Sequence, residues 1–211
     1  MPGRLNVFGV AAKKWINGRM RITGGKVSRR ILKVPKGFDV RPTPDLVKQA
    51  LFNSLGDRVV NARVLELFAG TGALSLESLS RGATHAVCVE KSARHAQMIR
   101  HNLEIAALSA GSLEVRVQDV FAALTQLVAG AARFNLVLAD PPYGEKNVGQ
   151  RSRSIAQRLL DDSNLPQILG PGGLFVLGHT KRDTLDVPPG WRELKLLKHG
   201  DSIMRFLELN D

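Results

Sequence analysis

The chain has 211 residues, 44% of them hydrophobic, so one domain with a sizeable core fits and a second large domain does not. Residues 1–41 hold 11 Lys or Arg against one acid, whereas residues 42–211 hold 19 against 18 acids. A near-neutral body with a basic arm favours contact with nucleic-acid phosphates over a merely solvated tail. Because no apolar run approaches the roughly 18 residues of a membrane span, and no secretory signal is visible, we expect a cytoplasmic protein.

The first predicted helix follows the basic arm. Thr43 is expected to cap it, with Pro44 at the first helical position, and Gly56 is expected to end it. We therefore expect a basic N-terminal extension over residues 1–41 and one folded domain over residues 42–211.

From residue 63 onward, short apolar strands alternate with helical patterns, which indicates a mostly parallel sheet covered by helices on both faces. Strands are expected at residues 64–68, 85–89, 113–117, 134–139, 174–178, 191–198 and 203–209. Helices are expected at residues 73–81, 92–107, 120–128 and 154–165. The last two strands are joined by a link so short that it allows only an antiparallel hairpin at the sheet edge.

A strand that runs through a glycine turn into a helix is typical of sites for nucleotide-like ligands. Gly70 and Gly72 let the main chain of this turn approach a ligand closely. A dinucleotide site would normally have a third glycine where Ser75 stands, and would not need the acid Glu66 before the turn. Glu66 instead suits the ammonium group of S-adenosylmethionine.

Two further acids end the next two predicted strands. Glu90 can accept from both hydroxyls of a ribose, and Asp119 can accept from an adenine amino group, although Asp119 could instead be a helix N-cap. Acids at three successive strand ends, together with the glycine turn, favour S-adenosylmethionine as the cofactor. The predicted cofactor-binding residues are Glu66, Phe68, Ala69, Gly70, Thr71, Gly72, Glu90, Lys91, Asp119 and Val120.

The most specific motif is Asp140-Pro141-Pro142-Tyr143, which follows an apolar strand. Its prolines make the turn rigid, so the Asp140 carboxylate and the Pro141 carbonyl are held in place. Together they can accept both hydrogens of an exocyclic amino group, which localises the nitrogen lone pair for attack on a sulfonium methyl group. Tyr143 offers a flat face on which a base can stack. These four residues are the predicted catalytic residues.

The basic, histidine and cysteine residues predict phosphate contacts and give no sign of a metal site or a reactive thiol. The predicted phosphate contacts in the basic arm are Arg21, Lys26, Arg29, Arg30 and Lys33. The five histidines are scattered without metal-ligand spacing, so no metal site is expected. The single cysteine, Cys88, lies in a predicted strand and is expected to be a buried core thiol.

Taken together, these motifs resemble the RsmD family, bacterial class I methyltransferases that modify the 2-amino group of one guanine in 16S ribosomal RNA. The resemblance spans nearly the whole chain after residue 19. It is carried by Met20-Arg21-Ile22-Thr23-Gly24-Gly25-Lys26, Arg41-Pro42-Thr43, Ala50-Leu51-Phe52-Asn53, Leu67-Phe68-Ala69-Gly70-Thr71-Gly72-Ala73-Leu74, Glu77 and the Asp140 motif. Residues 1–19 fall outside the family pattern.

The resemblance implies a fold, a cofactor and a partner. The fold is a Rossmann-like α/β class I methyltransferase, with a seven-stranded, mostly parallel sheet, an antiparallel last strand and helices on both faces. The cofactor is S-adenosylmethionine, and the partner is 16S ribosomal RNA in a small-subunit particle. Arg41 and Thr43 are implied to border the active site, and we count them among the RNA-binding residues. A monomer is expected.

Other functions stay open on the residues alone. A DNA adenine methyltransferase shares the Asp140 motif but needs a target-recognition domain, for which the chain leaves little room. A protein-glutamine methyltransferase typically has Asn in place of Asp140. A non-catalytic RNA-binding assembly factor on the same fold is the third alternative, although the four acids speak against it.

Overall fold

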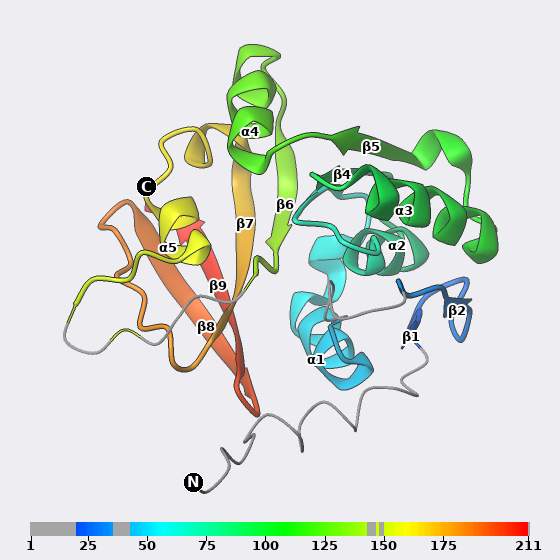
Figure 1. Cartoon of the computed structure of the whole chain (residues 1–211), viewed down its shortest axis with the longest axis horizontal. Helices are drawn as coiled ribbons and strands as arrows, with labels where there is room; N and C mark the ends of the chain where they lie inside the picture. Colours follow the sequence, from blue (N-terminus) through cyan, green and yellow to red (C-terminus); the bar gives the residue numbers. More distant parts are fainter. Residues whose placement is uncertain (1–19, 36–42, 143–146, 148–149, 211) are drawn as a thin grey trace, which may run out of the picture.

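The computed structural model describes residues 20–35, 43–142, 147 and 150–210 (Figure 1). Its strands are β1 (Met20–Arg21), β2 (Ile31–Leu32), β3 (Arg63–Leu67), β4 (His85–Glu90), β5 (Leu113–Val117), β6 (Phe134–Ala139), β7 (Leu169–Thr180), β8 (Trp191–His199) and β9 (Ser202–Leu209). Its α-helices are α1 (Asp45–Leu55), α2 (Ala73–Ser80), α3 (Ala93–Ala106), α4 (Val120–Ala129) and α5 (Ile155–Leu160). Short 3₁₀ helices are η2 (Gly56–Val59), η3 (Ala110–Ser112) and η4 (Pro166–Ile168).

Seven strands form one sheet in the order β5-β4-β3-β6-β7-β9-β8. The neighbours from β5 to β7 are parallel, whereas β9 is antiparallel to both β7 and β8. The predicted sheet, with its antiparallel last strand and terminal hairpin, is therefore confirmed. Because β9 pairs with β7, the hairpin places β8 at the edge of the sheet.

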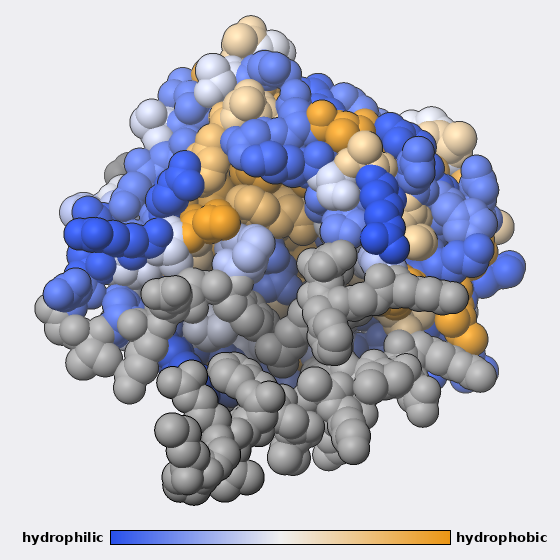
Figure 2. Space-filling view, in the orientation of Figure 1, coloured by the Kyte–Doolittle hydropathy of each residue, from blue (hydrophilic) through white to orange (hydrophobic). Residues whose placement is uncertain are grey.

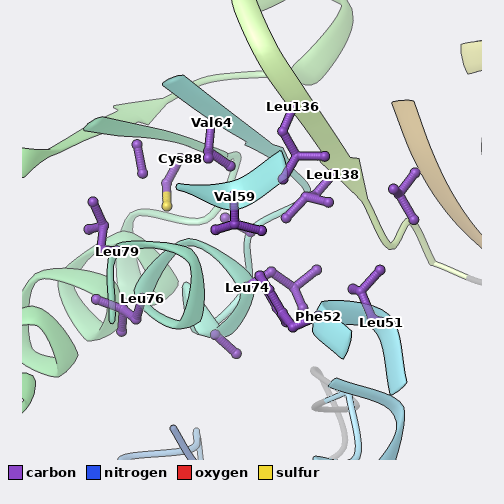
Figure 3. Close-up of a cluster of buried hydrophobic side chains, with 14 of the residues drawn as sticks. Leu51, Phe52, Val59, Val64, Leu74, Leu76, Leu79, Cys88, Leu136 and Leu138 are labelled. Atoms are coloured by element: carbon purple, nitrogen blue, oxygen red, sulfur yellow. The ribbon is translucent and has the colours of Figure 1, made fainter. Parts of the chain in front are cut away.

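Helices cover both faces of this sheet, as the alternating pattern predicts. Helices α1, α2 and α3 pack on one face, and α4 and α5 pack on the other, which gives two separate apolar layers. Figure 3 shows the first layer, where Phe52 of α1 and Leu74 of α2 lie against Leu138 of β6. Cys88 lies in the same layer and is fully buried, as expected for a core thiol.

Three local predictions are wrong. Helix α5 ends at Leu160 because the Asp162 carboxylate accepts from the N–H groups of Asn164 and Leu165, a local turn that competes with the helix. Strand β7 begins at Leu169, five residues before the expected start, and its glycine-rich first part contains a register shift opposite β6. The third wrong prediction is the N-cap of α1, which the sequence assigns to Thr43.

Helix α1 has no side-chain cap. Pro44 occupies the N-cap position in an extended conformation, and the hydroxyl of Thr43 bonds outside the helix. The residue before a proline is driven toward extended backbone, which carries Thr43 away from the helix N-terminus. The predicted end of α1 is confirmed, since Gly56 caps its C-terminus with a left-handed φ of 52°.

The described part of the basic arm packs against the domain. Strands β1 and β2 pair as an antiparallel hairpin, whose residues Met20, Ile22 and Leu32 are buried in the first apolar layer. The boundary expected after Arg41 lies outside the described residues and stays a prediction. No helix in the described part of the chain is long and apolar enough to cross a membrane.

Candidate active site

The glycine turn between β3 and α2 has a left-handed backbone at three positions. Phe68, Gly70 and Gly72 have φ angles of 58°, 54° and 73°. A bulky aromatic residue rarely adopts this conformation, and such strain is common where a loop is shaped for a ligand. Gly72 is also required by packing, because a Cβ there would lie 2.8 Å from the side chain of Ile99. The turn therefore has an unusual backbone conformation, and packing against Ile99 keeps it in place.

Glu66 is hydrogen-bonded to the backbone that follows this turn. The carboxylate is buried and accepts hydrogen bonds from the backbone N–H groups of Leu74, at 3.3 Å, and Ser75, at 2.8 Å. Burial raises the pKa of Glu66 to about 7, although the bonds from Ser75 and Leu74 act in the opposite direction. In this structure Glu66 therefore organises the start of α2, and its predicted contact with the cofactor ammonium stays a prediction.

Glu90 and Asp119 also bond to nearby backbone. Glu90 accepts from the N–H of Gly70 with one oxygen and from the N–H of Ser92 with the other, both at 2.8 Å. It thereby ties the end of β4 to the glycine turn. Asp119 caps α4, and its Oδ1 accepts from Phe121 at 3.0 Å and Ala122 at 3.5 Å. The N-cap role left open for Asp119 is therefore present, and its contact with an adenine stays a prediction.

The Asp140 motif begins where β6 ends, beside the glycine turn. Leu67 of β3 pairs with Ala139 of β6, so the residues that follow them, Phe68 and Asp140, leave the sheet at the same edge from neighbouring strands. This is the arrangement that methyl transfer from a cofactor on the glycine turn needs. Pro141 and Pro142 follow in the described chain, whereas Tyr143 lies outside the described residues.

Asp140 contacts a residue that the sequence assigns to RNA binding. The hydroxyl of Thr43 donates to Oδ2 of Asp140 at 2.9 Å. Among the described residues, Thr43 is thus part of the environment of the predicted catalytic acid. Arg41, the other residue implied to border the site, lies outside the described residues.

The predicted phosphate contacts lie on and just after the β1–β2 hairpin. Lys26, Arg29, Arg30 and Lys33 are exposed. Arg21 differs, because its guanidinium forms an ion pair with Asp45 at 2.8 Å. Half of the Arg21 side chain is still accessible, so a phosphate would have to share it with Asp45.

Sequence reasoning gave no structural role to three supporting residues, of which it named only Glu77, as part of the family pattern. Asn102 is a buried polar residue that bonds to the glycine turn, and Glu77 accepts from both the N–H and the hydroxyl of Thr23. A signal for Asn102 existed, since it lies on the same helical stripe as the apolar Ile99 and Leu103. Gly178 is the third; no local pattern shows that it lies beside Asp140.

Figure 2 shows apolar surface in a hollow near the centre of the view, bounded by hydrophilic residues. Among the described residues, no group of three or more His, Cys, Asp or Glu side chains is arranged to hold a metal ion. The described part of the site combines the backbone of the glycine turn with the acids Glu66, Glu90 and Asp140.

Comparison with known proteins assigns the chain to a family. The family described as Conserved hypothetical protein 95 matches residues 20–208. The chain belongs to this family, the RsmD family of S-adenosylmethionine-dependent methyltransferases. It is 39% identical over 127 residues to the ribosomal RNA small subunit methyltransferase D of Escherichia coli, an alignment that covers 60% of this chain and 62% of that protein.

Solved structures agree with this assignment. The structure of yhhF from Escherichia coli matches with a TM-score of 0.75 and 28% identity, over 91% of this chain and 98% of that one. The Thermus thermophilus 16S rRNA N2 G1207 methyltransferase RsmC, in complex with AdoMet and guanosine, matches with a TM-score of 0.59 and 27% identity. That match covers 83% of this chain and 45% of the RsmC chain.

Proposed function

We propose that this RsmD-family protein methylates the exocyclic 2-amino group of a guanine in 16S ribosomal RNA. We further propose that it acts in the cytoplasm as a monomer, on the RNA of a small-subunit particle. The observation that carries the proposal is the pairing of Leu67 with Ala139, which brings the glycine turn and Asp140 to one edge of the sheet. The names of the Escherichia coli and Thermus thermophilus relatives support ribosomal RNA, and the latter supports guanine N2.

The residues present fit S-adenosylmethionine. The cofactor supplies, when bound, an electrophilic methyl group on a sulfonium centre. Gly70 and Gly72 leave the backbone open to close approach, and Glu90, which already fixes the N–H of Gly70, is the candidate acceptor for the ribose hydroxyls. Lys91 is exposed at the start of the next loop, where it can line the site.

The transfer itself depends on Asp140 and the rigid turn after it. The carboxylate and the Pro141 carbonyl accept the two amino hydrogens, which localises the lone pair on the nitrogen. The nitrogen that these two acceptors hold could then take the methyl group that a bound cofactor would supply. The methylated nitrogen then loses one proton, for which the Asp140 carboxylate is the nearest assigned acceptor. The contribution of the protein is mainly orientation and electrostatic stabilisation.

The proposal is tested with radiolabelled cofactor and three substrates. Small subunits from cells that lack the modification, duplex DNA, and total protein are each incubated with the enzyme. We expect label in 16S ribosomal RNA only. Label in DNA would favour the adenine methyltransferase alternative. Cofactor binding with no label in any substrate would favour the non-catalytic assembly factor.

A further inference from the structure

The carboxylate of Asp140 lies against the backbone of the neighbouring strand. A Cβ added to Gly178 of β7 would be 2.5 Å from Oδ1 of Asp140 and 3.1 Å from its Cγ. A Cβ contact of 2.5 Å is essentially never seen, so no residue larger than glycine fits at position 178 unless Asp140 moves. The φ of Gly178 is not left-handed, so the requirement is for space rather than for backbone freedom. The backbone of Gly178 therefore packs directly against this carboxylate.

The other oxygen of the carboxylate is bonded by Thr43, two residues before α1. Thr43 donates its hydroxyl proton to Oδ2 of Asp140 at 2.9 Å, across 97 residues of chain. Because a hydrogen bond has a preferred direction, this bond restrains the rotation of the Asp140 carboxylate.

The position of Thr43 is itself held by the first turn of α1. Asp45 forms ion pairs with Arg21 at 2.8 Å and with Lys48 at 3.2 Å. The Lys48 side chain is fully buried, and its ammonium also donates to the backbone carbonyl of Arg21. These contacts attach the start of α1 to the β1–β2 hairpin. Thr43, which bonds to Asp140, therefore lies beside a segment that is tied to the hairpin.

We propose that Thr43 and Gly178 are positioning residues, which hold the Asp140 carboxylate in the orientation that accepts the amino hydrogens of the substrate. This inference rests on the proposed function and replaces the RNA-binding role that the sequence gives Thr43. A misplacement of about 1 Å at a reacting group lowers the rate roughly 100-fold, so both contacts matter for the chemical step. Cofactor and RNA affinity do not depend on them.

The test compares single-turnover rates of methyl transfer to small subunits. Thr43→Val removes the hydroxyl at nearly constant shape, Thr43→Ser retains it, and Gly178→Ala pushes on Oδ1. We expect Thr43→Val and Gly178→Ala to lower the rate by about 100-fold. Thr43→Ser is expected to restore it to within about three-fold of the wild type. The KM for small subunits and the Kd for S-adenosylhomocysteine should stay within about two-fold of the wild type in all three variants.

Matched controls come from the same chain. Thr125→Val removes a hydroxyl whose bonds to described residues are to Phe121 in α4 and to Asn164, and Gly190→Ala adds a methyl group where no described atom lies within 4 Å. Both should retain the wild-type rate. A raised KM with an unchanged rate in Thr43→Val would restore the RNA-binding role and overturn the inference. An unchanged rate in Gly178→Ala would overturn it as well. If the wild type itself transfers no methyl group, the proposed function fails and this inference fails with it.

Discussion

The side-chain amide of Asn102 donates a hydrogen bond to the backbone carbonyl of Thr71, at 3.1 Å, in the middle of the glycine turn. The same side chain accepts from the N–H of Lys33 at 2.7 Å and donates to its carbonyl at 3.0 Å. Asn102 is fully buried on α3, so one satisfied amide joins the cofactor turn to the segment that leaves the basic hairpin. The two proposed binding surfaces are therefore parts of one packed unit.

Replacing Asn102 should affect stability and cofactor affinity together. Asn102→Ala leaves the N–H of Lys33 and two carbonyls without this partner, and we expect the free energy of unfolding to fall by roughly 3 kcal/mol. The Kd for S-adenosylhomocysteine should rise, because the carbonyl of Thr71 is no longer fixed. Chemical denaturation and calorimetric titration measure the two effects. Asn135→Ala, which removes one exposed bond to Arg63, is the control; equal losses in both variants would contradict the special role of Asn102.

Arg29 and Arg30 should contribute to RNA affinity through charge. Both side chains are exposed, and the hairpin is held by backbone bonds between Ile22 and these two residues, so it survives their truncation. We expect the double change to alanine to weaken binding of 16S ribosomal RNA and to reduce the slope of log Kd against log salt by about 1.5. Filter binding over a salt series measures this slope.

A charge-matched control for that experiment lies outside the hairpin, near the amino ends of β3 and β6. Arg58 precedes β3 and Arg133 precedes β6, and both are exposed near the amino ends of the strands. Their double change to alanine removes the same charge outside the β1–β2 hairpin. An equal reduction of the salt slope would show that net charge, rather than the hairpin, governs binding.

Glu66 should make stability depend on pH near neutrality. Because burial raises its pKa from 4.5 to about 7, the folded protein holds a proton in this range that the unfolded chain has released. The contribution of Glu66 to the free energy of unfolding is therefore fully present below about pH 4.5 and is lost as pH rises through about 7. The free energy of unfolding falls by roughly 3 kcal/mol in total across this pH range.

The measurement compares the wild type with Glu66→Gln between about pH 5 and pH 8. Gln cannot ionise, so we expect the gap in unfolding free energy between the two proteins to narrow as pH rises. If the gap is constant over this range, the carboxyl group is ionised throughout, and the two bonds from α2 outweigh its burial.

Much of the fold follows from local patterns in the chain. The apolar strands, the glycine turn and the short link before Ser202 predict the sheet and its terminal hairpin, because each is a property of neighbouring residues. The Asp140 motif is likewise read directly from four adjacent residues. What the local pattern cannot supply is the partner of each side chain.

Thr43 illustrates that limit. Its position before Pro44 is typical of a helix cap, yet its hydroxyl bonds to Asp140, which follows a strand distant in sequence. Gly178 is similar, since its need for space depends on a side chain that follows the adjacent strand. Such contacts depend on tertiary packing, whereas propensity describes only neighbours along the chain.

The most direct test of the account is to identify the methylated nucleoside and its dependence on Asp140. Small subunits treated with enzyme are digested to nucleosides, and 2-methylguanosine is quantified by mass spectrometry for the wild type and Asp140→Ala. We expect 2-methylguanosine from the wild type and a loss of at least roughly 100-fold in the variant, with the Kd for S-adenosylhomocysteine nearly unchanged. Methylation of another nucleoside, or full activity in Asp140→Ala, would contradict the account.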